Sequence, residues 1–115
     1  MSIKVAVASS DGKVINRHFG QAAQFLVFQI QGSNIEFLEL RENIPPCQEP
    51  EYHENRLSDT VELLSDCQAV LVSRIGPGAA RALEAGGIKA YVAPDYIEAV
   101  LRRLIITGEL KQQDD

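Results

Sequence analysis

Cysteine and long apolar runs are both scarce in this sequence. Only Cys47 and Cys67 occur among its 115 residues, which is too few for a disulfide framework and fits free thiols in a reducing cytosol. No apolar run approaches the roughly 18 residues that a membrane-spanning helix needs. No apolar signal-peptide segment follows Met1 either. We therefore expect a cytoplasmic protein without a membrane partner.

Positive charge is also in short supply. Lys and Arg number 11 against 16 Asp and Glu, so the formal net charge is −5. Proteins that bind nucleic acid present a basic stripe to the phosphates, and none is visible here, so we expect no nucleic-acid partner. The apolar content of 45% is that of an ordinary globular protein. Residues 1–115 are expected to fold as a single domain, with 109–115 as a frayed tail.

Short apolar segments alternate with helix-like segments along the chain. Strands are predicted at 3–8, 25–30, 35–40, 69–72 and 88–92. Helices are predicted from near Asn55, after Gly76 and after Asp95. Right-handed crossovers make the first, fourth and fifth strands parallel, and the hairpin between them adds one antiparallel strand. The pattern predicts an α/β fold with a mixed, mainly parallel five-stranded sheet and helices packed on it.

Two of the predicted helices carry recognisable local signals. Gly76-Pro77-Gly78 opens the second helix, because proline is tolerated in a first turn. Ala80 and Leu83 should face the core from that helix. Asp95 followed by Glu98 resembles a capping box at the start of the third helix.

The binding site is expected outside the carboxyl ends of the parallel strands, where open α/β sheets hold their ligands. Loops beginning at Ser9, Ser73 and Ala93 follow those three strand ends, and the first of them continues to Arg17 and His18. These loops are therefore predicted to meet.

The loop after the fourth strand has the best features for holding an anion. Gly76 and Gly78 lie at a helix start, where unpaired N–H groups carry partial positive charge and small residues allow close approach. Arg74 adds a full charge. A second interpretation, in which Gly76 only caps the helix and Arg74 is a solvated side chain, fits the spacing equally well. The Lys-Ser/Thr ending of a phosphate loop is missing.

His18, Cys47 and His53 are the candidate metal ligands. Imidazole and thiolate suit soft or borderline metals. A lone loop histidine is more often a surface residue, and a cysteine and a histidine in the irregular stretch 42–54 fall short of the three protein ligands of a zinc site. Cys67 lies at a helix–strand junction and is expected in the core.

No catalytic set holds together in this sequence. Asp11 and Asp95 lie in the right loops but suit turn and cap roles. Cys47 with His53 as its base would stand in a proline-rich loop, which preorganises a site poorly. Acidic metal ligands on the central strands, as a nuclease of the ribonuclease-H type would need, are missing as well. We therefore expect a binding protein rather than an enzyme.

Four motifs lie along nearly the whole chain: the strand from Lys4 to Ser9, His18-Phe19-Gly20, Ile75-Gly76 and Gly86-Gly87-Ile88. Together they resemble the nitrogenase iron–molybdenum cofactor biosynthesis family. The family includes NifX, the cofactor-binding domain of NafY and the carboxyl-terminal domain of NifB.

This resemblance implies a ribonuclease-H-like three-layer α/β/α fold and a carrier or chaperone function. The cargo would be an anionic metal–sulfur cluster, either iron–molybdenum cofactor or its iron–sulfur precursor, exchanged with cofactor-assembly or nitrogenase proteins. The expected cluster contacts are Ser9, Arg17, His18, Arg74, Gly76 and Gly78. His18 is the best candidate for coordination, followed by Cys47 and His53. Two alternatives stay open: a carrier of another molybdenum- or copper–sulfur cluster, and a protein-interaction or regulatory module without metal.

Overall fold

Residues 2–43 and 54–110 are described by the computed structural model, so Cys47 and His53 lie outside the described residues. The strands are β1 (Ile3–Val7), β2 (Gln24–Gln31), β3 (Asn34–Glu42), β4 (Ala69–Val72) and β5 (Lys89–Val92). The helices are a one-turn 3-10 helix, η1 (Phe19–Gln21), and the α-helices α1 (Glu54–Leu63), α2 (Pro77–Ala85) and α3 (Ile97–Ile106). No helix in this part of the chain is both long and apolar enough to cross a membrane.

The five strands form one mixed sheet in the order β3-β2-β1-β4-β5. β1 pairs in parallel with β4, and β4 with β5, whereas β2 is antiparallel to both β1 and β3. The predicted mixed sheet with a hairpin on one side is therefore confirmed. The carboxyl ends of the parallel strands β1, β4 and β5 therefore lie at one edge of the sheet, as the predicted binding site requires.

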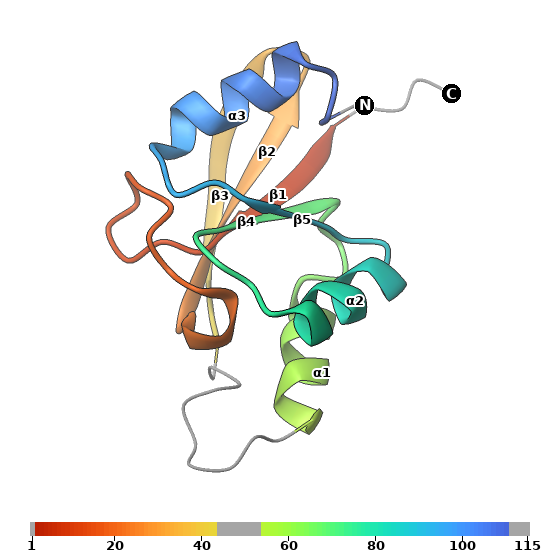
Figure 1. The fold of residues 1–115 in the computed structure, drawn as a ribbon. Helices are drawn as coiled ribbons and strands as arrows, with labels where there is room; N and C mark the ends of the chain where they lie inside the picture. The colour runs from red at the N-terminus through yellow and green to blue at the C-terminus, as the bar shows by residue number, and fades with distance from the viewer. Residues whose placement is uncertain (1, 44–53, 111–115) are drawn as a thin grey trace.

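Both faces of the sheet are covered, α3 lying on one face and α1 with α2 on the other (Figure 1). Val5, Val7 and Leu71 face α3 and pack with Ile97 and Leu101. The alternate strand residues, such as Ala6, Val70 and Val72, pack on the other side with Leu64 and Leu83. The apolar strands of the sequence are thus buried on both faces because each face carries its own helical layer.

The start of α2 matches its sequence signals, with Gly76 as N-cap and Pro77 in the first turn. Leu83 is buried as predicted, but Ala79 rather than Ala80 packs against the core with it. Ala80 instead lines a shallow hollow beside Glu84, because it lies on the flank of the helix next to β5.

The predicted capping box at α3 is wrong. The N-cap is Tyr96, and no side chain caps the helix. The N–H of Ile97 donates to the carbonyl of Lys13, 2.9 Å away, so a backbone carbonyl of the loop after β1 satisfies one of the free N–H groups at the helix start. Glu98 forms an ion pair with Arg102 at 3.1 Å instead of reaching back.

The chain end also departs from expectation, since the frayed tail does not begin at 109. Leu110 is buried in the core beneath α3. Glu109 lies beside Lys89 and Tyr91 of β5, with Nζ of Lys89 3.4 Å from its carboxylate. The burial of Leu110 and these contacts of Glu109 together hold this segment against the sheet.

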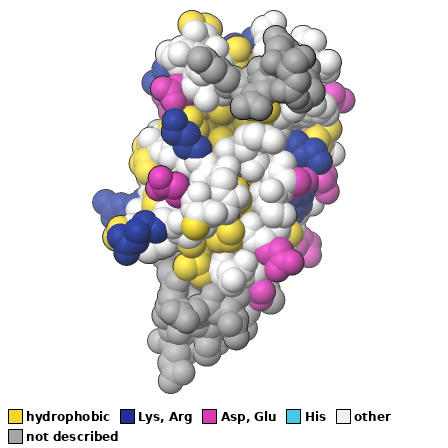
Figure 2. All heavy atoms as spheres, turned by 90° about the vertical axis from the view of Figure 1, so that its right-hand side faces the viewer, with side chains coloured by type: hydrophobic (Ala, Val, Ile, Leu, Met, Phe, Trp, Pro, Cys, Tyr) yellow, Lys and Arg dark blue, Asp and Glu magenta, His cyan; other side chains and the backbone are white. Residues whose placement is uncertain are grey.

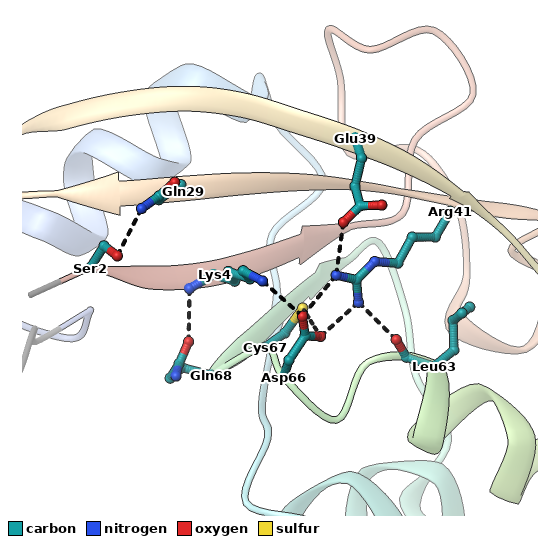
Figure 3. Close-up of polar contacts among 9 residues, drawn as sticks. All are labelled: Ser2, Lys4, Gln29, Glu39, Arg41, Leu63, Asp66, Cys67 and Gln68. Atoms are coloured by element: carbon teal, nitrogen blue, oxygen red, sulfur yellow. Dashed lines mark hydrogen bonds and ion pairs between the residues drawn. The ribbon is translucent and has the colours of Figure 1, made fainter.

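A charged network ties β3 to the connection between α1 and β4 (Figure 3). The guanidinium of Arg41 donates to both carboxylate oxygens of Asp66, at 2.7 and 2.8 Å, and to the carbonyl of Leu63 at 2.8 Å. Lys4 of β1 approaches the same carboxylate at 3.0 Å. These paired charges hold the pKa of Asp66 well below its usual range, chiefly through the hydrogen bonds from Arg41.

Candidate functional site

The loops after β1 and β4 are joined by backbone hydrogen bonds at the shared sheet edge. The N–H of Arg17 donates to the carbonyl of Ala8 at 3.2 Å, and the carbonyl of Arg17 accepts the N–H of Ser73 at 2.9 Å. One step further, Phe19 donates its N–H to the carbonyl of Arg74 at 2.9 Å. The segment from 17 to 19 therefore lies between the ends of β1 and β4, which brings His18 beside Arg74.

The loop after β5 meets an earlier part of the β1 loop, at residues 14 and 15. Ile15 donates its N–H to the carbonyl of Asp95 at 2.9 Å, and Val14 pairs with Tyr96 in an isolated bridge. Asp11 shapes the turn by accepting from the N–H groups of Lys13 and Val14, which lowers the pKa of its carboxyl. The predicted meeting of three loops is confirmed.

Phe19 anchors the segment that presents His18. Its side chain is fully buried, with its ring centroid 5.9 Å from that of Phe25 on β2. His18 itself is exposed, as the residue preceding η1. A buried aromatic ring next to an exposed imidazole fixes the backbone from which the imidazole projects.

A cavity of about 510 Å³ lies where η1, α1 and the start of α2 come together. His18, Phe19, Gly20 and Gln21 form one wall; Arg74, Ile75, Gly76, Gly78 and Ala79 form another, and Leu57 of α1 completes the lining. The cavity thus brings together His18, Arg74, Gly76 and Gly78 from the residues expected to bind a cluster. An apolar lining with a few convergent cationic and N–H groups is typical of a binding site.

Ser9 and Arg17 do not line this cavity. Ser9 is fully buried, and its hydroxyl both donates to Asp11 at 3.2 Å and accepts the N–H of Gly12 at 3.0 Å. It is therefore a turn residue. Arg17 contributes its backbone to the junction of the loops, while its side chain is exposed outside the lining.

The start of α2 leaves room for a ligand. A methyl group added at Gly76 or Gly78 would meet nothing within 4 Å. Neither glycine has a positive φ, so neither packing nor backbone conformation demands glycine there. The small residues instead leave the first N–H groups of the helix open to the cavity side.

Metal coordination by described residues would rest on few groups. Within 2–43 and 54–110, no cluster of at least three His, Cys, Asp or Glu side chains is assembled for a metal ion. Burial raises the pKa of Cys67 to about 11, so this core residue is a neutral thiol at pH 7. His18 is thus the ligand candidate that the cavity offers.

Sequence reasoning missed part of the cavity wall. Leu57 reads as an ordinary core position of α1, and Gln21 belongs to a motif noticed for its histidine. Nothing in their spacing signals a cavity, because their proximity depends on how α1 is placed after residues 44–53.

A larger cavity, of about 850 Å³, lies elsewhere, between α3 and the β2–β3 hairpin. Its walls are mainly apolar and include Phe28, Ile35 and Phe37. None of its described lining residues is a histidine. Gly12 and Lys13 of the β1 loop reach it, but no residue of the joined segment 17–19 or of the β4 loop does, so we take the smaller cavity as the candidate site. On the β5 side, shown in Figure 2, acidic, basic and apolar side chains are mixed and no histidine is visible.

The fold and this cavity define a small α/β domain with a candidate ligand site, in which a histidine and an arginine lie at a helix start. The chain belongs to the dinitrogenase iron-molybdenum cofactor family, whose profile matches residues 1–107. The resemblance seen in the sequence motifs is therefore confirmed.

Curated relatives match this chain over only part of their own length. The FeMo cofactor biosynthesis protein NifB of Frankia alni is 33% identical over 105 residues, covering 89% of this chain and 21% of that protein. Protein NifY of Azotobacter vinelandii is 36% identical over 86 residues, covering 74% of this chain and 34% of that protein. The chain thus corresponds to about a fifth to a third of these proteins.

Among solved structures, the apo form of the orange protein from Desulfovibrio gigas shares the fold. The TM-score is 0.65 at 17% identity, over 96% of this chain and 92% of that one.

Proposed function

We propose that this domain binds an anionic metal–sulfur cluster, iron–molybdenum cofactor or its iron–sulfur precursor, and carries it between assembly proteins without catalysing a reaction. The observation that carries the proposal is one cavity holding an imidazole, a guanidinium and a helix start. Membership of the family supports the choice of cargo. The sheet order β3-β2-β1-β4-β5 further supports a ribonuclease-H-like classification.

The chemistry of the cavity suits such a cargo. A sulfide-rich cluster is bulky and negatively charged, so an apolar wall from Phe19, Leu57 and Ile75 can contact its surface while Arg74 and the start of α2 offset its charge. The imidazole of His18 supplies one borderline ligand. A single ligand with several weaker contacts favours reversible holding, which a carrier needs.

The decisive experiment is an anaerobic titration of the protein with isolated iron–molybdenum cofactor, followed by gel filtration and elemental analysis of iron and molybdenum. Stoichiometric co-elution is expected for the parent. His18→Ala should weaken binding about tenfold or more, the loss of one charge-assisted or coordinate contact.

Lys13→Ala serves as control for this titration, because Lys13 is an exposed residue of the same loop that does not line the cavity. Equal affinity of His18→Ala and the parent would remove His18 from the site. Absence of co-elution with the parent would contradict this cargo, and tetrathiomolybdate with copper would then test the other molybdenum–sulfur clusters.

Arg74→Gln is expected to weaken cofactor binding about five- to tenfold at low salt and to flatten its dependence on ionic strength, because a charge at the site is removed. Arg102→Gln is the matched control: it removes an exposed arginine of α3, outside the cavity. Affinity would be measured from 50 to 300 mM salt, which changes the screening length about 2.5-fold. An unchanged salt slope for Arg74→Gln would show that Arg74 does not face the bound cluster.

A second candidate function, a protein-interaction module, is favoured by the apolar cavity between α3 and the hairpin. Phe37, half-exposed in its wall, stacks edge-on against Phe28 at 5.6 Å. This function would be preferred if the domain bound an assembly protein equally well in the complete absence of cluster.

A further inference from the structure

Asn43, the last described residue before 44–53, is held behind η1 by two hydrogen bonds. Its side-chain amide donates to the carbonyl of Ala22 at 2.9 Å, and its backbone N–H donates to the carbonyl of Ala23 at 2.9 Å. Ala22 is the C-cap of η1, and its N–H donates to the carbonyl of Phe19 at 3.3 Å. Asn43 is thereby attached to the turn that forms the histidine-bearing wall of the cavity.

The same amide also reaches α1. The hydroxyl of Thr60, a fully buried residue of α1, donates to the amide oxygen of Asn43 at 3.1 Å. Thr60 lies three residues after Leu57, so the two side chains share one face of the helix. Among the α1 residues whose side chains are described, Leu57 lines the cavity. One side-chain amide thus connects the η1 wall with the α1 wall, although neither Asn43 nor Thr60 lines the cavity.

We propose that Asn43 and Thr60 are positioning residues: their hydrogen bond sets the separation between η1 and α1, and so the width of the cavity. The inference rests on the proposed function where it concerns the ligand, but the geometry can be tested without one. A side-chain amide that is bonded through both its oxygen and its nitrogen, here to the fully buried Thr60 and to the carbonyl of Ala22, holds its two neighbours in one arrangement.

The test compares four variants of the full chain. Thr60→Val keeps the shape of the side chain and removes the hydroxyl, Asn43→Ala removes both amide contacts, and Thr60→Ser restores a hydroxyl. Val100→Ala is the control for stability, since it creates a defect in the core beneath α3, on the opposite face of the sheet. Affinity for isolated iron–molybdenum cofactor would be measured well below each unfolding transition.

Thr60→Val and Asn43→Ala are expected to bind the cofactor about three- to tenfold more weakly, the range that one net hydrogen bond supports. Thr60→Ser should bind like the parent, and Val100→Ala should bind like the parent although it is less stable. Parent-like affinity for Thr60→Val, or no rescue by Thr60→Ser, would overturn the proposal while leaving the carrier function intact.

A second readout needs no ligand and therefore separates this inference from the carrier function. In NMR spectra of the free protein, Thr60→Val should shift the methyl signals of Leu57 and the amide signal of Gln21, and Thr60→Ser should return both. If the parent binds no cofactor, the carrier function fails and these signals alone decide the positioning role. Unchanged signals in Thr60→Val would overturn it.

Discussion

Phe19→Ala is expected to lower the free energy of unfolding by about 3–5 kcal/mol, the usual cost of removing a fully buried phenylalanine. The ring is 0% exposed and contacts Phe25 as well as the layer beneath α1 and α2. The same ring anchors the backbone that carries His18, so the folded fraction of this variant should also bind the cofactor less well. A loss of this size is a large share of the total stability of a typical small domain.

Urea unfolding at pH 7 checks the expectation, with Phe37→Ala as the matched control. Phe37 is the same residue type but 52% exposed on β3, so its truncation should cost much less, about 1 kcal/mol. Phe19→Leu should recover most of the loss, because it refills most of the cavity. If Phe19→Ala were no more damaging than Phe37→Ala, Phe19 would not be the anchor of this segment.

The fold could be predicted from the sequence in segments whose apolar pattern is determined by burial. The run from Ala69 to Val72 is apolar because its residues alternate between the two helical layers, and that run is β4 without an error at either end. The order of strands and helices then restricts the topology, because crossovers between parallel strands are right-handed. Asp95 shows where such reasoning fails. The helix has Tyr96 as its N-cap, one residue later than the pattern predicts, the Asp95 carboxylate accepts the N–H of Tyr96, and the carbonyl of Lys13, distant in sequence, accepts that of Ile97.

The candidate site could be predicted only in part, for the same reason. His18, Arg74 and Gly76 follow strand ends, and the edge of a parallel sheet brings such residues together whatever their spacing. Leu57 lines the cavity from α1, and Asn43 contacts α1 through Thr60, but the placement of α1 depends on tertiary contacts rather than local pattern. Ser9 is the reverse case: it is predicted to contact a ligand, but its hydroxyl is engaged in hydrogen bonds with Asp11 and Gly12 within its own turn.

Asp66→Asn is expected to lower the free energy of unfolding at pH 7 by about 1–2 kcal/mol, a figure already reduced for solvent screening because the carboxylate is 44% exposed. Arg41, 13% exposed, would lose its two-point partner and keep Glu39 at 3.1 Å. A largely buried guanidinium left with fewer partners is the main source of the loss.

The pH dependence of stability follows from the same contacts. Hydrogen bonds from Arg41, aided by Lys4, lower the pKa of Asp66 in the folded protein from its ordinary 3.8, so the unfolded chain takes up the proton first as pH falls. The stabilisation is therefore complete above about pH 5 and is lost progressively as the pH falls through 4 towards the lowered folded pKa. Urea unfolding of the parent and Asp66→Asn at pH 7 and pH 3 should show that the difference between their free energies of unfolding is smaller at pH 3.

Glu98→Gln, which removes the exposed pair with Arg102, is the control and should change stability by less than about 0.5 kcal/mol at either pH. A difference between parent and Asp66→Asn that stayed constant from pH 7 to pH 3 would mean that the carboxylate contributes through shape rather than charge.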